Sequence, residues 1–398
     1  MPRPLHIPSE NWDDWRWQMR NRVSSPEALG EWITPEASEI DGIRATEGIF
    51  RWNITPHYAS LMDPGDPACP VRRQVVPLAS ECEPDLVGVV DPLEEVAHSP
   101  VKNLIHNYPD RVAFCVTAEC AIYCRYCLRK RMVGDADAMM RRSELDAAVE
   151  YIRAHPAIRD VLLTGGDPLT FSDARVEELV SAVRSVPHVD VVRIGSRMPV
   201  KLPQRITPAL AGLLGRYRVW LNTHFNHARE LAPEAGEALD RLLEAGVPVG
   251  NQTVLLRGIN DRAEVLRDLL SGLVSRRVRP YYLYQAQLIG GTRHFRTSIE
   301  HGMELMAELQ GTLTGFAIPV YVLDTPYGKV PLNRSWVLGR CGDHVILRTT
   351  RGTIWAEPNP RPEGDPSEPL PEIPMPEGAE TVPTGAARFA AEGWVVPA

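Results

Sequence analysis

Blocks of apolar residues alternate with amphipathic segments through the middle of the chain. Short β-rich runs recur at 112–117, 160–166, 190–196, 218–225, 247–256, 280–286 and 319–324. Continuous Val, Ile and Leu runs of this kind are typical of strands buried on both faces of a parallel sheet. Between them, the segments 143–155, 172–186, 207–217, 233–246 and 263–278 carry apolar residues at helical spacing. Ser143 is the expected N-cap of the first of these helices.

This alternation predicts an α/β fold in which right-handed crossovers connect parallel strands. About six or seven such units favour a partial (β/α)6-type TIM barrel. Residues 109–340 would form this barrel, and residues 1–108 a mostly helical N-terminal region that includes a helix over 9–22. Residues 341–398 would be a Pro-rich C-terminal extension. Ten prolines fall between residues 357 and 398, so this tail is expected to be extended and partly disordered.

Composition and charge narrow the classes of function. The 398 residues are 44% apolar and 24% charged, which is ordinary for a globular protein and excludes a collagen or a coiled coil. The formal net charge of −8 makes nucleic acid and acidic membranes poor partners. No run of about 18 apolar residues occurs, and the charged N-terminus does not resemble a secretory signal. We therefore expect a cytoplasmic protein that acts on a small molecule.

The carboxyl ends of the predicted strands carry the candidate chemistry, as is usual in a βα barrel. The residues placed there are Cys120, Gly165, Gly166, Asp167, Ser196, His224, Gln252, Gln287 and Asp324. Close-spaced cysteines in a cytosolic chain more often bind metal than form disulfides.

Cys120, Cys124 and Cys127 follow the first predicted barrel strand with the spacing C-x3-C-x2-C. Three thiolates on one tight loop can each bind an iron of a [4Fe–4S] cube and leave the fourth iron open to chelate a small molecule. The alternatives are a zinc site, which would need a fourth Cys or His at ligand spacing, and a chance cluster. The spacing resembles the signature of radical S-adenosylmethionine enzymes.

The segment LTGGD at 163–167 ends the second predicted strand. Its glycines expose backbone groups that could hydrogen-bond the ammonium of S-adenosylmethionine, and Asp167 adds negative charge. The alternative is an ordinary strand-to-helix turn. Residues assigned to S-adenosylmethionine binding are Gly165, Gly166, Asp167, Ser196, His224 and Gln252.

Many segments resemble the lysine 2,3-aminomutase family, in the family's order, from about residue 10 to about residue 355. They include CRYCLRKR, LLTGGDPL, RIGSRMPVKLPQRIT, NTHFNH, NQTVLLRGIND and DTPYGKVPLN. The resemblance implies an isomerase that moves an α-amino group to the β-carbon of an amino acid. It implies a [4Fe–4S] cluster, S-adenosyl-L-methionine and pyridoxal 5′-phosphate as cofactors, a flavodoxin- or ferredoxin-type reductant, and a homo-oligomer.

Pyridoxal phosphate requires a lysine that can form a Schiff base. Outside the cysteine loop the chain has only Lys102, Lys201 and Lys329. Lys329 follows a predicted strand end and matches the family's cofactor lysine, although the residues before it are less glycine-rich than in the family. The alternative is a solvated surface lysine.

Arginines are expected to hold the anionic groups of the cofactor and the substrate. The resemblance places Arg111, and alternatively Arg125, near the cofactor phosphate. Arg129 matches the arginine that pairs with the substrate carboxylate, a task that suits a bidentate guanidinium. In the alternative interpretation, at least one of Arg129, Lys130 and Arg131 belongs to a basic surface run.

Two residues bear on the choice of substrate. In the lysine enzymes two aspartates hold the distal ammonium; one matches Asp324, and the other falls at Gln287. An amide and a carboxylate suit a delocalised guanidinium better than a compact ammonium, so the sequence favours L-arginine, giving β-arginine, over L-lysine. Asp324 would repel L-glutamate.

A structural zinc is not expected, because Cys341 is the only C-terminal cysteine and Arg262 occupies the position of the family's internal zinc ligand. Three other classes compete with an aminomutase of this kind. They are a β-lysine-forming enzyme of translation-factor modification, a cluster-bearing protein without catalysis, and a nucleic-acid-modifying radical enzyme. Gln287 counts against the first, the three cysteines and Lys329 against the second, and the net charge against the third.

Overall fold

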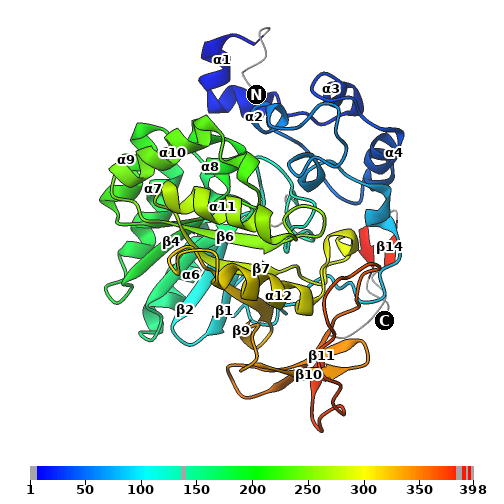
Figure 1. The fold of residues 1–398 in the computed structure, drawn as a ribbon. Helices are drawn as coiled ribbons and strands as arrows, with labels where there is room; N and C mark the ends of the chain where they lie inside the picture. Colours follow the sequence, from blue (N-terminus) through cyan, green and yellow to red (C-terminus); the bar gives the residue numbers. More distant parts are fainter. Residues whose placement is uncertain (1–6, 136–139, 382–387, 391–392, 396–398) are drawn as a thin grey trace.

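Parallel strands and the helices between them form the centre of the protein (Figure 1). The computed structural model describes residues 7–135, 140–381, 388–390 and 393–395. The parallel strands are β2 (Arg111–Thr117), β3 (Asp160–Gly165), β4 (Val191–Gly195), β5 (Trp220–Thr223), β6 (Val249–Leu255), β7 (Arg279–Gln285) and β8 (Val320–Thr325). Each pairs in parallel with the next. This arrangement confirms the predicted α/β fold with a barrel-like sheet.

Two antiparallel strands stand at the edges of this sheet. β1 (Leu104–Tyr108) pairs with β2, and β9 (Gly328–Pro331) pairs with β8. β1 and β9 are the two ends of the nine-strand order. The backbone N–H of Lys329 nevertheless donates to Tyr108 Oη at 2.7 Å. The barrel is therefore partial, and a side chain of β1 bonds the backbone of β9 across the seam.

Helices follow the strands along the outside of the sheet (Figure 1). They are α6 (Arg142–Ala154), α7 (Asp173–Arg184), α9 (Pro208–Arg216), α10 (Pro233–Glu244), α11 (Ala263–Ser275) and α12 (Ile299–Gln310). Ser172, Thr207 and Ser298 cap α7, α9 and α12 by accepting a backbone N–H three residues later. The N-cap prediction at Ser143 is wrong, because α6 already begins at Arg142 and Ser143 lies inside its first turn.

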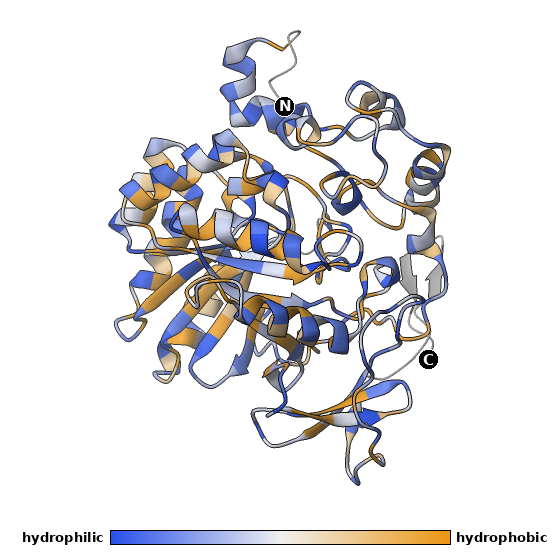
Figure 2. Cartoon of the chain, in the orientation of Figure 1, coloured by the Kyte–Doolittle hydropathy of each residue, from blue (hydrophilic) through white to orange (hydrophobic). Residues whose placement is uncertain are grey.

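The strands are amphipathic, which corrects the expectation that both of their faces are buried in a packed core. In β3, Val161 and Leu163 are fully buried in the same apolar cluster as residues of α7. Asp160, Leu162 and Thr164 alternate with them and line a cavity instead. Figure 2 shows the apolar residues along the strands and polar residues on the outer helices.

The N-terminal region consists of short helices: α1 (Ser9–Asp13), α2 (Trp15–Arg20), α3 (Pro26–Gly30), α4 (Ala37–Thr46) and α5 (Pro56–Ser60). The predicted single helix over 9–22 is divided at Asp14, whose side chain caps α2. Two 3-10 turns follow, η1 (Arg72–Gln74) and η2 (Ala79–Cys82). Gln74 and Glu81 reach from these turns to the loops of the barrel.

A second sheet follows the barrel and contains β10 (Val337–Cys341), β11 (His344–Arg348), β12 (Ile354–Pro358) and β13 (Glu380–Thr381). The short strands β14 (Arg388–Ala390) and β15 (Gly393–Val395) pair with each other. The first part of the Pro-rich tail is more firmly attached than expected, because the Asn359 amide donates to Glu300 Oε2 of α12 at 2.6 Å. None of the helices in the described part of the chain is long and apolar enough to cross a membrane.

Candidate active site

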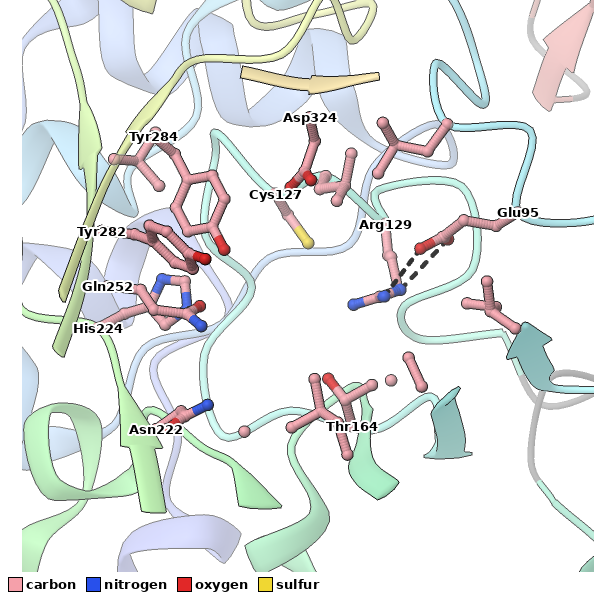
Figure 3. A pocket seen from close by; sticks show the side chains of 18 of the residues that line it. Glu95, Cys127, Arg129, Thr164, Asn222, His224, Gln252, Tyr282, Tyr284 and Asp324 are labelled. Carbon is pink, nitrogen blue, oxygen red and sulfur yellow. Dashed lines mark hydrogen bonds and ion pairs between the residues drawn. The ribbon is translucent and has the colours of Figure 1, made fainter. Parts of the chain in front are cut away.

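A cavity of about 590 Å³ opens inside the partial barrel (Figure 3). Its lining contains every predicted site residue except Arg125. These residues are Cys120, Cys124, Cys127, Gly165, Gly166, Asp167, Ser196, His224, Gln252, Gln287, Asp324, Lys329, Arg111 and Arg129. The volume lies within the usual range of small-molecule sites. The fold therefore brings together residues that are far apart in the sequence.

The three cysteines stand on the loop after β2, beside two buried cations. Arg197 Nη1 lies 3.0 Å from Cys124 Sγ. Burial opposes ionisation of Cys124, but the charges of Lys201 and Arg197 outweigh it and lower the pKa of this thiol. Among the described residues, no three His, Cys, Asp or Glu side chains converge on one point where a single metal ion would bind. In an iron–sulfur cube each thiolate binds its own iron. Three thiols that face one cavity next to cations therefore fit such a cluster.

Two glycines allow the neighbouring loop to pack against the cysteine loop. A Cβ atom at Gly165 would clash with the carbonyl oxygen of Thr117, and one at Gly166 with that of Glu119. Gly165 also has a φ of +114°, which side-chain-bearing residues rarely adopt. The N–H of Gly166 donates to Thr117 O at 2.5 Å. The glycines are thus required for contact between the loops, and their role toward S-adenosylmethionine stays a prediction.

Asp167 connects the ends of β3 and β4. Its Oδ1 accepts from Ser196 Oγ at 2.7 Å, and its Oδ2 accepts from the backbone N–H of Arg197 at 2.8 Å. The same carboxylate caps the turn after β3 through the N–H of Leu169. Both oxygens are therefore engaged, so Asp167 holds the two loops together as well as lining the cavity.

His224, directly after β5, faces Gln252, which lies in the middle of β6 and not at the predicted strand end (Figure 3). His224 Nε2 lies 2.8 Å from Gln252 Oε1. Burial, reinforced by the charge of Arg197, lowers the pKa of His224 to about 3. The imidazole is therefore neutral at pH 7 and donates to the glutamine, which orients both side chains toward the cavity.

Lys329 and Asp324 face each other across the β8–β9 hairpin. They are paired residues in its register, and Lys329 Nζ lies 2.9 Å from Asp324 Oδ1. Burial favours the neutral amine, but Asp324 outweighs it and raises the pKa of Lys329 above its usual range. The amine also lies within about 6 Å of the rings of Tyr108, Tyr282 and Tyr284. The alternative of a solvated surface lysine is wrong.

Arg129 points into the cavity and is held from behind by Glu95 (Figure 3). Its Nη2 lies 2.8 Å from Glu95 Oε1, and Arg131 Nη2 lies 2.8 Å from Glu95 Oε2. The side chains of Arg129, Lys130 and Arg131 are only 17%, 4% and 14% exposed. The alternative of a basic surface run is therefore wrong for all three.

Arg111 and Arg125 occupy different places. Arg111 lines the cavity and stacks on Tyr108, with its guanidinium carbon 3.7 Å from the ring centroid. Arg125 is not part of the lining, because its buried guanidinium lies 2.5 Å from Glu81 and is turned away from the cavity wall. The prediction that Arg125 contacts the cofactor phosphate is corrected accordingly, since its charge is already neutralised by a buried carboxylate.

Gln287 lies next to Asp324, as the resemblance implies. Its Nε2 donates to the backbone carbonyl of Asp324 at 3.0 Å, so its own carbonyl oxygen remains as a neutral acceptor in the cavity wall. This cavity is lined neither by Cys341 nor by Arg262. Cys341 lies at the end of β10, and Arg262 precedes α11 and pairs with Glu264.

The sequence analysis did not identify several residues of the site. Tyr282 and Tyr284 carried a usable signal, because strand alternation places positions two apart on one face. Arg197 carried a weaker signal as a basic residue just after a strand. Glu95 and Glu230, the carboxylates that pair with Arg129 and Arg197, carried none, because they come from segments without a regular apolar period.

Comparisons with known proteins agree with this geometry. A profile of the radical SAM superfamily matches residues 114–270, and a lysine-2,3-aminomutase profile matches residues 306–382. An L-lysine 2,3-aminomutase from Clostridium subterminale is 46% identical over 357 residues, 88% of this chain and 86% of that protein. One from Fusobacterium nucleatum is 45% identical over 352 residues, 88% and 83% of the two chains. A glutamate 2,3-aminomutase from Clostridioides difficile is 41% identical over 353 residues, again 88% and 83%.

Proposed function

Since the chain belongs to the lysine 2,3-aminomutase family of radical SAM enzymes, we propose that it converts L-lysine to β-lysine, with L-arginine as the alternative substrate. It is an isomerase of the 2,3-aminomutase type with a [4Fe–4S] cluster, S-adenosylmethionine and pyridoxal phosphate as cofactors. It acts on a small molecule and needs a reductant. The bound cofactors supply a carbon-centred radical and a conjugated ring that stabilises unpaired electron density. The chain supplies binding, orientation and exclusion of water.

We assign the cofactors to opposite sides of the cavity. Cys120, Cys124 and Cys127 hold the cluster. His224 and Gln252, from the neighbouring strands β5 and β6, belong with the S-adenosylmethionine side. Pyridoxal phosphate belongs with the β8–β9 hairpin and its lysine, where tyrosine rings provide flat surfaces. Arg111, stacked on Tyr108 near that hairpin, supplies a positive charge for the phosphate.

Arg129 is assigned to the substrate carboxylate. Glu95 accepts from Nε and Nη2 of Arg129 and leaves Nη1 without a bond to that carboxylate. A guanidinium has five N–H donors, so it can hold Glu95 and a substrate carboxylate together. Glu95 also prevents the long side chain from changing rotamer, which reduces the entropy lost when the substrate binds.

Asp324 and Gln287 are assigned to the distal end of the substrate. Asp324 holds the Lys329 ammonium in this structure, so its carboxylate is placed to hold a cation at this end of the cavity. It would attract the cationic side chain of a substrate, whereas the carboxylate of glutamate would be repelled. The Gln287 carbonyl adds a neutral acceptor, which an ammonium or a guanidinium can use.

The observation that carries the proposal is the pairing of Asp324 with Lys329 in a chain 45–46% identical to L-lysine 2,3-aminomutases. Gln287 is the specific reason to retain arginine, since an amide replaces the second carboxylate of the lysine enzymes. The test is kcat/KM of anaerobically reconstituted enzyme with L-lysine, L-arginine and L-glutamate. We expect lysine to be the best substrate. A higher value with arginine would support the alternative, and a higher value with glutamate would contradict both.

Gln287→Asp separates the two cationic substrates. It adds a second carboxylate beside Asp324, so the ratio of kcat/KM for lysine over arginine should rise about tenfold, as expected for one added charged hydrogen bond. Gln310→Asp introduces the same change at an exposed position at the end of α12 and should leave the ratio unchanged. An unchanged ratio in Gln287→Asp would remove Gln287 from the distal site.

A further inference from the structure

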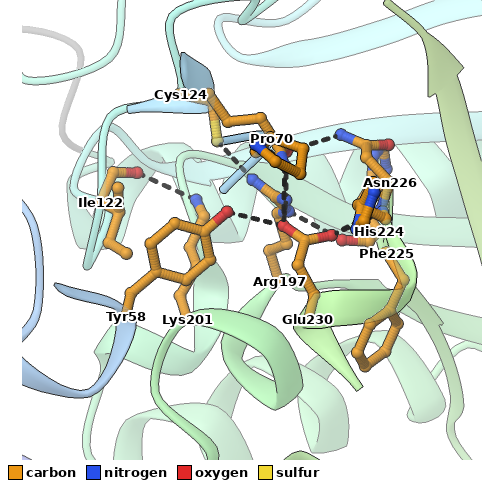
Figure 4. A network of polar contacts seen from close by, with 12 residues as sticks. Tyr58, Pro70, Ile122, Cys124, Arg197, Lys201, His224, Phe225, Asn226 and Glu230 are labelled. Carbon is orange, nitrogen blue, oxygen red and sulfur yellow. Dashed lines mark hydrogen bonds and ion pairs between the residues drawn. The ribbon is translucent and has the colours of Figure 1, made fainter. Parts of the chain in front are cut away.

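Arg197 and Lys201 are buried cations that lie against the cysteine loop, and of these two only Arg197 has a carboxylate partner (Figure 4). Arg197 Nη2 pairs with Glu230 Oε1 at 2.5 Å, and both side chains are buried. Tyr58 Oη donates to the same Glu230 oxygen at 2.6 Å. The positive charge that Arg197 brings to Cys124 is therefore largely balanced within its own network.

Lys201 is different. It is the last residue of α8 (Met198–Lys201), the short helix after β4. Lys201 is 4% exposed. Its Nζ donates to the backbone carbonyl of Ile122, inside the cysteine loop, at 2.9 Å. In the part of the chain that the structure describes, it forms no ion pair. The charge of Asp167 also acts on Lys201, but both oxygens of that carboxylate already accept hydrogen bonds from Ser196 and Arg197.

The surroundings hold this ammonium in place. Thr55 Oγ1 donates to the Lys201 carbonyl at 2.5 Å, which connects α8 to the N-terminal region. Lys201 also lines the cavity together with the three cysteines. The Thr55 bond fixes the backbone at the end of α8, and the side chain cannot turn to solvent without losing the Ile122 carbonyl.

A buried ammonium without a carboxylate is costly unless another anion compensates it. Lys201 Nζ binds the loop between Cys120 and Cys124 and lines the cavity with all three cysteines. The anion placed to compensate it on this side of the cavity is thus the set of thiolates that the cluster requires. A cube bound by three thiolates gains a further negative charge when it accepts an electron, so a fixed cation beside it favours the reduced state.

We propose that Lys201 is the counter-charge of the iron–sulfur cluster and raises its reduction potential, so that one electron from the external reductant is accepted more readily. Lys201 is a positioning and tuning residue, because it touches the loop that carries the ligands and not the substrate. The inference rests on the cluster and not on the identity of the amino acid. It holds whether lysine or arginine is the substrate.

The test compares two variants of the full-length protein with reconstituted cluster, without S-adenosylmethionine, pyridoxal phosphate or amino acid. Lys201→Gln keeps a hydrogen-bond donor for the Ile122 carbonyl but removes the charge. Lys201→Arg keeps the charge. Lys102→Met, at a lysine whose side chain is 53% exposed, is the control. The measurements are iron per chain and the midpoint potential from an electron paramagnetic resonance titration.

Lys201→Gln should lower the midpoint potential by about 59 mV or more, which is a tenfold change in the equilibrium constant of a one-electron reduction. Lys201→Arg and Lys102→Met should stay within half of that value. An unchanged midpoint potential in iron-loaded Lys201→Gln would overturn the proposal. Equal shifts of the midpoint potential in Lys201→Gln and Lys201→Arg would also overturn it. If Lys201→Gln does not bind iron, the Lys201→Arg variant tests the proposal. A wild-type iron content and midpoint potential in Lys201→Arg would support a role of the charge, and loss of iron from Lys201→Arg would overturn it.

Discussion

Replacing Glu81 by glutamine should weaken the attachment of the cysteine loop to the N-terminal region. Glu81 is fully buried in η2, and its carboxylate lies 2.5 Å from Arg125 Nη2 and 2.7 Å from Lys130 Nζ. Both cations belong to the cysteine loop and the residues just after it. Glu81→Gln leaves two buried cations without the anion that balances them, while the shape of the side chain hardly changes.

The magnitude follows from the protonation of this carboxyl group. Burial opposes the charge, but Arg125 and Lys130 outweigh it and lower the pKa of Glu81 from about 4.5 to about 2. The unfolded chain therefore binds more protons between these two pH values, and the stabilisation is complete above about pH 5 and is lost as the pH falls toward 2. A pKa difference of this size corresponds to about 3 kcal/mol. Breaking a buried ion pair typically costs ~3–5 kcal/mol.

Lys130→Met is the matched comparison. Burial lowers the pKa of Lys130 to about 8, so at pH 7 the folded state bears a cost for holding this ammonium charged. Lys130 Nζ already lies 4.0 Å from the ring centroid of Phe50, a position that a methionine can fill. The neutral Arg125–Glu81 pair would remain, so the stability should change by no more than about 1 kcal/mol.

Urea unfolding at pH 7 measures both variants. Glu81→Gln should lose about 3 kcal/mol or more and retain less iron per chain after reconstitution, and the loss should shrink as the pH falls below 4.5. Arg153→Met removes an exposed pair with Glu150 and should cost less than about 1 kcal/mol. Equal losses in Glu81→Gln and Lys130→Met, or a loss in Glu81→Gln that does not depend on pH, would refute the reasoning.

Two further predictions concern the cavity. Arg129→Lys should raise KM for the amino acid about tenfold with a smaller change in kcat, because an ammonium lacks the planar fork that can hold Glu95 and a substrate carboxylate together. Steady-state kinetics measures both constants. An unchanged KM would exclude the assignment of Arg129 to the substrate carboxylate. Asp324→Asn should let Lys329 lose its proton at a lower pH, because Asp324 raises the pKa of that amine. Borohydride trapping of pyridoxal phosphate across a pH series measures this shift, and an unshifted profile would contradict it.

The strand-end residues were predictable because two local signals agree. Apolar runs marked the strands, and the parallel arrangement places every carboxyl end at the same side of the barrel. Cys120, Gly166, His224 and Asp324 therefore lie around one cavity, as expected. The β8–β9 hairpin was not predicted, yet its register brings Asp324 opposite Lys329, so the site depends on a strand that the apolar pattern did not identify.

The partners of the charged side chains were not predictable in the same way. The resemblance offered Arg125 as an alternative for the cofactor phosphate. The carboxylate that neutralises it, Glu81, lies 44 positions upstream in a segment without a regular apolar period. Glu95, which pairs with Arg129 from 34 positions upstream, was not predicted for the same reason.

Lys201 is the opposite case. The sequence compared it with Lys329 only as a candidate cofactor lysine, and the predicted strand end before Lys329 favoured that residue. What distinguishes them is the nearest anion: a carboxylate for Lys329 and the cysteine loop for Lys201. The pattern of apolar positions determines which side chains reach the cavity, but the function of a charge inside it depends on which opposite charge the fold places beside it. That placement is set by contacts between distant segments, and it is the reason that two lysines in one cavity receive different roles.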